Sequence, residues 1–354
     1  MRILVLYDGK LGHLSQSYGF AQLIASRFLG DVSVHTCSAK PRLKLLNKPL
    51  RKLAGLTPYL AFKTVLSSYH VEDALPDQTD IVISFGGNVV ALNIALSQYW
   101  GAANIAIGNT YGLSPSLISV HATARGTAAA NSVATGVALA KTDPGFCQRA
   151  GELLVHSAKA PLWTLLVGGD GSGYHYSEDD WQKLGQAMHS LSNRHGIRWL
   201  VSTSRRTHAK GVEILRRYAT PQICEAAIWY GVSSTDSLDA YLGAGYRLFC
   251  TEDSMSMLSE AVAMSKPVVS LRPSETSTKR VHTAMLSHLE ESGLIARESV
   301  DSVTMYQPRP FAPRRSYRAQ LDDIYQQIAD KLALPEFSAT SDQRERSLTL
   351  LATH

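Results

Sequence analysis

The sequence lacks the features of several protein classes. No apolar run approaches the roughly 20 residues that a membrane-spanning helix needs, and the first residues hold only a short apolar run, whereas a signal peptide has a longer one and a small-residue cleavage site. The four cysteines, at positions 37, 147, 224 and 250, form no C-x-x-C pair, so neither a zinc site nor a disulfide framework is indicated. We therefore expect a soluble protein of the cytoplasm.

Several active-site motifs are also missing. The chain has no D-x-D, which would hold a diphosphate through a metal ion, and no H-E-x-x-H or G-x-S-x-G. The pairs Asp179-Asp180 and Asp322-Asp323 lie at or in expected helices, where they are more simply helix-start or surface charges. The sequence therefore predicts a site that requires no metal and no cofactor.

Acidic residues are absent between Asp31 and Glu72. In this interval seven basic residues interleave with leucines, which predicts a basic amphipathic surface that could lie on anionic lipid. A solvated face over ordinary core leucines explains the pattern equally well, and nucleic-acid binding is not expected because no recognition module is visible. Residues 40–63 are hereafter called the basic stretch, and its basic residues are Lys40, Arg42, Lys44, Lys48, Arg51, Lys52 and Lys63.

Short β-rich runs alternate with helix-length amphipathic stretches, a pattern typical of βα units on parallel sheets. The 354 residues, 45% hydrophobic and 18% charged, fit two globular domains of this kind. We expect strands at 3–7, 32–37, 80–85, 104–107, 117–120, 160–167, 198–203, 225–229, 247–250 and 267–271. We expect helices near 14–28, 43–54, 58–68, 88–99, 178–194, 208–219, 235–243, 254–264, 278–292 and 319–332.

The domain boundary is expected between 140 and 160, where the residues KTDPG at 141–145 are rich in turn formers. The first domain would span 1–150 and the second 151–315, the latter ending in a stretch rich in proline and arginine. A helix within 316–334 would cross back to the first domain. The polar tail, 335–354, is expected to be poorly ordered.

Ligands of open α/β sheets bind outside the carboxyl ends of the strands, so the turns that follow the expected strands are candidate sites. The first turn, DGKLGHLSQ at 8–16, combines glycines that let backbone amides approach an anion with four functional side chains. A mere tight turn is the alternative. The second turn, SFGGN at 84–88, also joins a strand to a helix. The candidate residues of these two turns are Asp8, Lys10, Gly12, His13, Gln16, Gly86, Gly87 and Asn88.

Three turns of the second domain are candidates for phosphate or ribose binding. GGDGSG at 168–173 is a candidate cradle, with a flexible loop as the alternative. TSRRT at 203–207 offers two guanidinium groups, which suit a diphosphate, although paired arginines on a helix start are often only solvated. TEDSMS at 251–256 ends a strand and begins a helix, and helix capping alone could explain Ser254 and Ser256. The candidate residues are Gly168, Gly169, Ser172, Ser204, Arg205, Arg206, Thr207, Asp253, Ser254, Met255 and Ser256.

Together, the segments 8–16, 203–207 and 251–261 resemble the plant mitochondrial-fission "elongated mitochondria" family and its bacterial relatives, which carry the name of glycosyltransferases. The resemblance covers most of residues 1–335. It implies the glycosyltransferase-B fold, in which two Rossmann-like doubly wound domains face a cleft and a C-terminal helix crosses back to the first domain.

The layout is also distantly similar to the lipid-linked murein GlcNAc transferase. Gly12-His13 resembles the turn that places a histidine near the acceptor in that family, and Gly86-Gly87 and Gly168-Gly169 resemble its glycine loops. The resemblance implies that Glu260 holds the donor ribose. Ser265 stands where the murein transferase pattern has glycine. SVHAT at 119–123 replaces the proline-x-His-Asp element of the fission family, so the resemblance does not identify the acceptor.

These features predict transfer of a sugar from a nucleotide-activated donor to an envelope, lipid-linked or other glycan acceptor. His13 or Asp8 would be the general base, and the Gly169 loop, Arg206 and the helix start at Ser254 would stabilise the departing diphosphate. The expected partners are a nucleotide sugar, a glycan or lipid-linked acceptor and, peripherally, the inner face of an anionic membrane. A nucleotide-sugar epimerase of the same fold and a non-catalytic membrane-associated scaffold are the alternatives.

Overall fold

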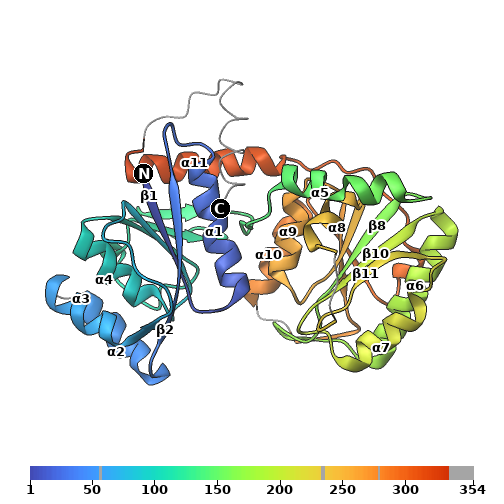
Figure 1. Cartoon of the computed structure of the whole chain (residues 1–354), viewed down its shortest axis with the longest axis horizontal. Coiled ribbons are helices and arrows are strands. Elements are labelled where there is room, and N and C mark those ends of the chain that lie inside the picture. The colour runs from blue at the N-terminus through green and yellow to red at the C-terminus, as the bar shows by residue number, and fades with distance from the viewer. Residues whose placement is uncertain (56–57, 233–235, 278–279, 335–354) are drawn as a thin grey trace. The chain divides into compact units, whose positions relative to one another are not determined.

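The computed structural model describes residues 1–55, 58–232, 236–277 and 280–334. Within the described residues, the chain forms two compact units, Met1–Lys141 with Arg318–Leu334, and Thr142–Tyr317. Each unit is a doubly wound α/β structure in which helices cover both faces of a largely parallel sheet (Figure 1). Two doubly wound α/β units are what the sequence predicted.

The sheet of the first unit has the strand order β3-β2-β1-β4-β5-β6-β7. All neighbours pair in parallel except β3, which runs antiparallel to β2. The order therefore reverses at β1, which lies between β2 and β4. The strands are β1 (Arg2–Tyr7), β2 (Ser33–Pro41), β3 (Tyr69–Val71), β4 (Ile81–Phe85), β5 (Ala103–Ile107), β6 (Val120–Thr123) and β7 (Ser132–Ala134).

Alternate residues of the strands supply the two cores of the first unit, because successive side chains of a strand point to opposite faces. Leu4 and Leu6 of β1 belong to one buried cluster with Leu50, Val65 and Leu92, which come from three helices on that face. Figure 1 shows α1 on the opposite face. The helices are α1 (Leu11–Ala25), α2 (Asn47–Ala54), α3 (Pro58–Ser67), α4 (Val90–Trp100) and α11 (Tyr317–Leu332), with 3-10 turns η1 (Lys44–Leu46) and η2 (Pro115–Leu117).

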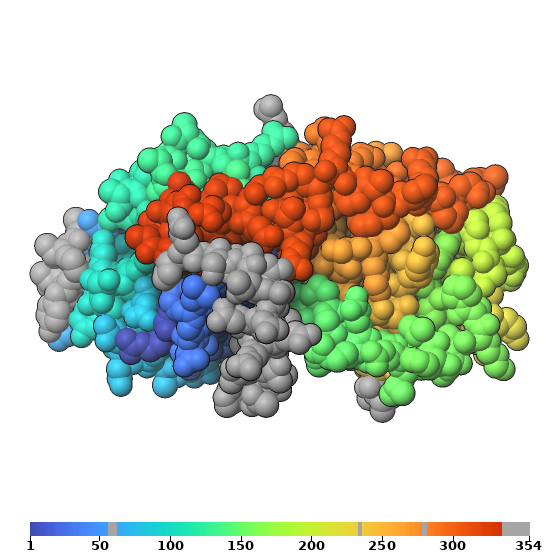
Figure 2. Space-filling view, turned by 90° about the horizontal axis from the view of Figure 1, so that it is seen from above, coloured from blue at the N-terminus to red at the C-terminus, as the bar shows by residue number. Residues whose placement is uncertain are grey.

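The last helix, α11, returns to the first unit, as the sequence predicted. Asp322 accepts hydrogen bonds from Arg27 at the end of α1, with a shortest distance of 2.7 Å, and the Lys331 ammonium donates to the carbonyl of Ala130 at 2.9 Å. Ile324 and Ile328 are buried. Figure 2 shows α11, in red, at the surface, which agrees with Asp322 being a surface charge.

The sheet of the second unit has the order β11-β10-β8-β12-β13-β15, with every pair parallel. The order reverses at β8, the first strand of the unit along the chain. The strands are β8 (Leu162–Val167), β10 (Arg198–Thr203), β11 (Cys224–Ile228), β12 (Arg247–Thr251), β13 (Val268–Arg272) and β15 (Ala296–Ser299), beside a two-stranded antiparallel pair of β9 (Tyr174–His175) and β14 (Glu275–Thr276).

The helices of the second unit also lie on both faces of its sheet (Figure 1). Leu162 and Leu200 pack with Tyr241 of α8 on one face, and Trp163, Trp199 and Phe249 form an aromatic cluster whose ring centroids lie 5.2–5.7 Å apart. The helices are α5 (Pro144–Ser157), α6 (Glu178–His195), α7 (Ala209–Tyr218), α8 (Leu238–Ala244), α9 (Met255–Ala263) and α10 (Arg280–Glu291), with the 3-10 turn η3 (Val303–Met305).

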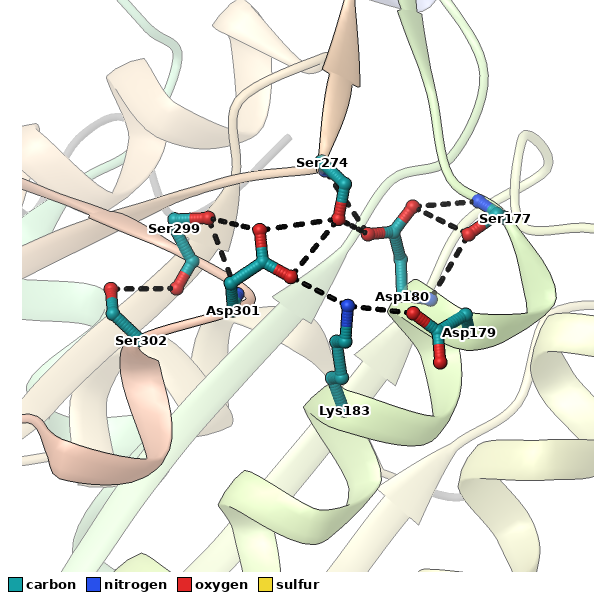
Figure 3. A network of polar contacts seen from close by, with 8 residues as sticks. All are labelled: Ser177, Asp179, Asp180, Lys183, Ser274, Ser299, Asp301 and Ser302. Carbon is teal, nitrogen blue, oxygen red and sulfur yellow. Dashed lines mark hydrogen bonds and ion pairs between the residues drawn. The ribbon is translucent and has the colours of Figure 1, made fainter.

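The first residues of α6 form a polar network with two other segments of the second unit (Figure 3). Asp180 forms a capping box with Ser177 and accepts hydrogen bonds from the amide and hydroxyl of Ser274, and Lys183 bridges Asp179 and Asp301 at 2.6 Å each. The first aspartate pair is therefore a helix start, as expected, but Asp180 also ties α6 to the end of β13.

Two predicted segments are wrong. The strand expected at 117–120 is the turn η2 followed by β6, because the Asn104 side chain bonds the backbone of Leu117 and Ser119, at 3.0 and 2.7 Å, and holds them out of the sheet. The turn-rich linker is mostly α5. Asp143 accepts from the Phe146 amide at 3.0 Å and Pro144 occupies the first helical turn, so the Asp-Pro pair begins a helix.

The first unit ends at Lys141, within the range of 140–160 expected for the boundary but nine residues before the domain end given at 150, because α5 packs on α8 of the second unit. A Cβ on Gly151 would lie 2.5 Å from the backbone nitrogen of Ala244, so the two helices approach closely. The tail predicted from Pro335 lies outside the described residues. Within the described ranges no helix has the length and apolarity to cross a membrane.

Candidate functional site

Four turns lie where the strand order of a sheet reverses, which is where open α/β sheets bind their ligands. In the first unit they follow β1 and β4 and contain residues 8–10 and 86–89. In the second unit they follow β8 and β12 and contain residues 168–173 and 252–254. The structure thus gives each unit one candidate site at the carboxyl edge of its sheet.

The site of the first unit centres on a carboxylate and an imidazole. Asp8 is buried directly after β1, and its Oδ1 lies 2.8 Å from Nδ1 of His13, in the first turn of α1. An ionised carboxylate only accepts hydrogen bonds, so Nδ1 carries the proton and Nε2 is left as an acceptor. The His13 ring also lies against Phe85, with centroids 4.6 Å apart, and remains 23% exposed. This geometry suits a general base.

The second Asp8 oxygen is held by an amide. Asn88 Nδ2 donates to Oδ2 at 2.9 Å, and the Lys10 ammonium lies 3.3 Å from the same atom. Burial by itself would raise the pKa of Asp8, but the hydrogen bonds of His13 and Asn88 and the charge of Lys10 together hold that pKa well below its usual value. Asp8 is therefore ionised at neutral pH and orients the imidazole.

Two residues behind Asn88 were missed by the sequence analysis. Asn47, at the start of α2, donates to Asn88 Oδ1 at 3.0 Å, and the buried Tyr69 hydroxyl donates to the Asn88 carbonyl at 2.7 Å. A polar chain thus runs from Asn47 through Asn88 and Asp8 to His13. No local pattern marked Asn47 or Tyr69, which lie in segments far from Asp8 in the sequence.

The Gly86-Gly87 turn is closely covered. A Cβ on Gly86, whose φ is +87°, would lie 3.2 Å from the His13 ring, and one on Gly87 would lie 2.2 Å from the Tyr111 ring. Arg51 stacks over Tyr111 with its Cζ 4.4 Å from the ring centroid. Glycine is required here because imidazole and phenol rings occupy the space of a side chain. Gly12 and Gln16 lie on α1 beside His13 and are half-buried.

The site of the second unit is built around the buried glycines 168 and 169. Thr207 Oγ1 donates to the Gly168 carbonyl at 2.5 Å and Ser204 Oγ at 3.3 Å, so the segment after β10 braces the turn after β8. A Cβ on Gly169 would lie 2.0 Å from the Arg206 carbonyl. Further along this turn Asp170 accepts from His175 at 2.6 Å and pairs with His208 at 3.0 Å.

Arg206 lies between this turn and the end of β12. Its Nη2 is 3.3 Å from Asp253 Oδ2, its Nη1 donates to the Asp253 carbonyl at 3.2 Å, and its side chain is 33% exposed. Asp253 is buried, and the burial raises its pKa to about 6 although Arg206 acts in the opposite direction. The guanidinium of Arg206 can therefore bind an anion from solvent, whereas the Asp253 carboxylate behind it is inaccessible to solvent.

Other predicted residues lie further from this centre. Arg205 is exposed, with no ion pair among the residues that the structure describes, and Ser172, in the left-handed region at φ +55°, is exposed. Ser254 is the N-cap residue of α9, although its side chain makes no capping hydrogen bond. Met255 and Ser256 begin α9, and Glu260 is half-buried further along the same helix.

Glu252, the neighbour of Asp253, was not predicted and is a buried carboxylate with several hydrogen-bond donors. Arg297 binds both its oxygens, at 2.7 and 3.0 Å, and the hydroxyls of Tyr174 and Ser270 donate to them at 3.0 Å. A bidentate arginine contact of this kind fixes geometry as well as charge. Glu252 therefore anchors the end of β12 to β13 and β15. In the described parts of the chain, no cluster of His, Cys, Asp and Glu is placed to hold a metal ion.

Comparison with solved structures gives several matches over the full length of the chain at low identity. MurG of Acinetobacter baumannii is 12% identical with a TM-score of 0.47, over 100% of this chain and 99% of that one. The ADP-heptose heptosyltransferase II of E. coli is 12% identical, with a TM-score of 0.47, over 94% and 99%. The UDP-GlcNAc 2-epimerase of Neisseria meningitidis is 11% identical, with a TM-score of 0.46, over 100% of both chains.

A search of curated protein sequences gives no match. A family model described as mitochondrial fission ELM1 matches residues 11–323, which is most of the chain and includes the candidate turns that follow β4, β8, β10 and β12. The resemblance stated from the sequence is thereby confirmed, and the chain belongs to the mitochondrial fission ELM1 family.

Proposed function

We propose that this protein is a glycosyltransferase that moves a sugar from a nucleotide-activated donor to a glycan or lipid-linked acceptor. The observation that carries the proposal is the oriented Asp8–His13 pair at the reversal point of the first sheet. The glycine turn with Arg206 at the reversal point of the second sheet supports it. One unit offers a base, and the other offers groups suited to a diphosphate.

In the proposed reaction His13 Nε2 takes the proton of an acceptor hydroxyl. The acceptor oxygen then forms a bond to the anomeric carbon of the donor sugar, and the bond from that carbon to the diphosphate breaks with its electron pair leaving on the phosphate oxygen. Asp8 holds the imidazole in the required tautomer and stabilises its protonated form. Asn88 and Asn47 keep Asp8 in place.

The departing diphosphate gains negative charge, so the second unit must supply donors. Arg206 has a fork of N–H groups and is partly exposed, and the turn at Gly168 and Gly169 gives backbone amides close access to an anion. These groups would stabilise the leaving group without a metal ion. We assign the donor to this turn, with Ser254 at the start of α9 and Glu260 further along it as additional contacts.

The acceptor side of the proposal includes contact with anionic membrane. Leu46, Leu50 and Leu53 of the basic stretch pack into the core, as the solvated-face alternative requires, but Leu43 and Leu45 are 62% and 91% exposed. Exposed lysines flank these two leucines at positions 44 and 48. Apolar side chains among basic ones are what an anionic lipid surface binds. Sedimentation with anionic and neutral vesicles tests this; equal recovery with both at low salt would remove it.

A binding screen with nucleotide sugars tests the proposed donor site. UDP-glucose, GDP-mannose and ADP-glucose are added separately, and unfolding is followed by a thermal scan. A ligand at about 100 times its Kd stabilises the folded protein by about 2.7 kcal/mol, which a scan detects readily. We expect Arg206→Ala to weaken this binding by a factor of about 10 to 100, the effect of one charged hydrogen bond.

Arg205→Ala is the matched control, because it removes the same charge from the neighbouring exposed position. Equal loss in both variants would mean that general charge, and not the Arg206 contact, binds the donor. An epimerase would convert the bound nucleotide sugar with no acceptor present. A scaffold would bind no nucleotide sugar and would leave the vesicle result unchanged.

A further inference from the structure

Asp253 is a buried carboxylate that has no well-formed hydrogen bond among the described residues, although Thr251 and the Gly169 amide lie close enough to lower its pKa. Its side chain is completely inaccessible, and neither of its oxygens has a hydrogen-bond partner among the residues that the structure describes. The nearest opposite charge is Arg206, at 3.3 Å from Oδ2. Buried charges are normally paired and hydrogen-bonded, so this arrangement is costly when the carboxylate is ionised.

The carboxylate lies directly beneath the candidate phosphate-binding turn. A Cβ on Gly168 would lie 2.3 Å from Asp253 Oδ1, so the carboxylate packs against the backbone of that turn. Arg206, which contacts Asp253, also reaches the other end of the turn, because its Nη1 would lie 2.6 Å from a Cβ on Gly171, and its side chain is 33% exposed whereas that of Asp253 is inaccessible. An anion that binds Arg206 from the exposed side therefore comes close to Asp253 and competes for its one cationic neighbour.

A bound anion adds negative charge near Asp253, which favours its neutral form. Burial has already raised the pKa of Asp253 to about 6, so only a small further rise brings it to neutral pH. Protonation would also free Arg206 to serve the ligand alone. We propose that Asp253 takes up a proton when a diphosphate binds at the Gly168–Arg206 turn, so that donor binding is coupled to pH. This inference rests on the proposed function.

Other ionisable groups surround Asp253, and most of them do not titrate near neutrality. Burial raises the pKa of Tyr176 and of Cys250 well above their ordinary values, and Glu252 is held by Arg297. Asp170, in the turn itself, pairs with His175 and His208, and Glu260 on α9 is half-buried.

His282 of α10 requires a control of its own. Its Nε2 lies 2.9 Å from the Glu252 carbonyl, and burial lowers its pKa below the ordinary value. It is therefore a further group that could change charge between about pH 5 and about pH 8, in addition to His175 and His208 beside Asp170 in the turn. A variant of His282 must accompany any variant of Asp253.

Isothermal titration calorimetry of the full chain with a nucleotide sugar from the binding screen tests the inference. A nucleotide sugar is the right probe because its diphosphate is esterified at both ends and does not titrate near neutral pH. The titration is run in two buffers of different ionisation enthalpy at about pH 7, and Kd is measured between about pH 6 and about pH 8.

We expect uptake of up to one proton per ligand in the wild type and a Kd that weakens by up to tenfold for each unit of rising pH. In Asp253→Asn, which keeps the shape of the side chain, we expect no proton uptake and a Kd independent of pH. In His282→Asn the pH dependence should persist.

The outcomes separate the two proposals. Binding with no proton uptake in the wild type overturns this inference and leaves the proposed function standing. Proton uptake that persists in Asp253→Asn, or that disappears only in His282→Asn, assigns the proton elsewhere and also overturns it. No binding of any nucleotide sugar at any pH overturns the proposed function and, with it, this inference.

Discussion

Each unit places an aspartate near the point where its strand order reverses, and the two aspartates have opposite surroundings. Asp8 follows the central strand β1, where His13, Asn88 and Lys10 hold its two oxygens. Asp253 follows β12, next to the central strand β8, with Arg206 as its one cationic neighbour and no hydrogen bond to either oxygen among the residues described. The pKa of Asp8 is lowered and that of Asp253 is raised.

This difference shows how surroundings, and not residue type, assign a carboxylate its role. A carboxylate that accepts several hydrogen bonds stays ionised and can orient a base, as Asp8 does for His13. A carboxylate that is buried with few partners is ready to accept a proton when negative charge approaches. Pairs of titratable groups whose pKa values are pushed apart are typical of active sites.

The largest expected effect concerns His13. Replacing His13 with Ala removes the proposed base, so release of nucleoside diphosphate from the donor should slow by about 10² to 10⁴-fold, or about 3 to 5 kcal/mol, with donor Kd almost unchanged. His70→Ala, an exposed histidine of the same unit, is the control. Asp8→Asn should slow release less. If His13→Ala releases the product at the wild-type rate, the first site has no chemical role, and Asp8 does not orient a catalytic base.

The next effect is on stability, and it should differ in sign between the two aspartates. The pKa of Asp253 lies about two units above its ordinary value of 3.8, so its ionisation destabilises the folded protein by about 3 kcal/mol above pH 6 and by nothing below about pH 4. Asp253→Asn should therefore raise the free energy of unfolding at about pH 8, with a difference that disappears towards pH 4.

Asp8→Asn should do the opposite. Because the pKa of Asp8 is lowered in the folded protein, its charge stabilises the fold above the pKa of the unfolded chain, and this contribution is lost as pH falls. Urea titrations of both variants from about pH 4 to about pH 8 measure the two curves. If both variants destabilise the protein equally at every pH, the proposed difference between the two carboxylates is wrong.

The smallest expected effect belongs to Asn47. Asn47→Ala removes one hydrogen bond to Asn88, which is worth about 1 kcal/mol, so product release should slow by about fivefold. A merely structural role would lower the melting temperature without changing the pH profile of catalysis. A positioning role would shift that profile, because a less constrained Asp8 no longer holds the His13 imidazole in one orientation. A wild-type profile together with a wild-type rate would remove Asn47 from the site.

The sequence by itself predicted the two α/β units and placed eight strands to within one or two residues, because buried parallel strands are short apolar runs that end in polar turns, but it predicted no strand at β3, β7, β9, β14 or β15. It also placed Asp8, His13, Gly168 and Arg206 after strands, and parallel strands bring such turns to one edge. It failed where side chains from elsewhere in the fold decide the backbone, as Asn104 does for the segment at 117–119.

Only the tertiary structure decided which polar groups meet. Asn47 and Tyr69 reach Asn88 across 41 and 19 residues of sequence, and Arg297 reaches Glu252 across 45. No local spacing encodes such contacts, because they depend on the order in which strands pair. The neighbours Glu252 and Asp253 make the same point. They are consecutive carboxylates in the turn after one strand, but the Glu252 side chain meets Arg297 and the hydroxyls of Tyr174 and Ser270, whereas the one cation that Asp253 meets among the described residues is Arg206.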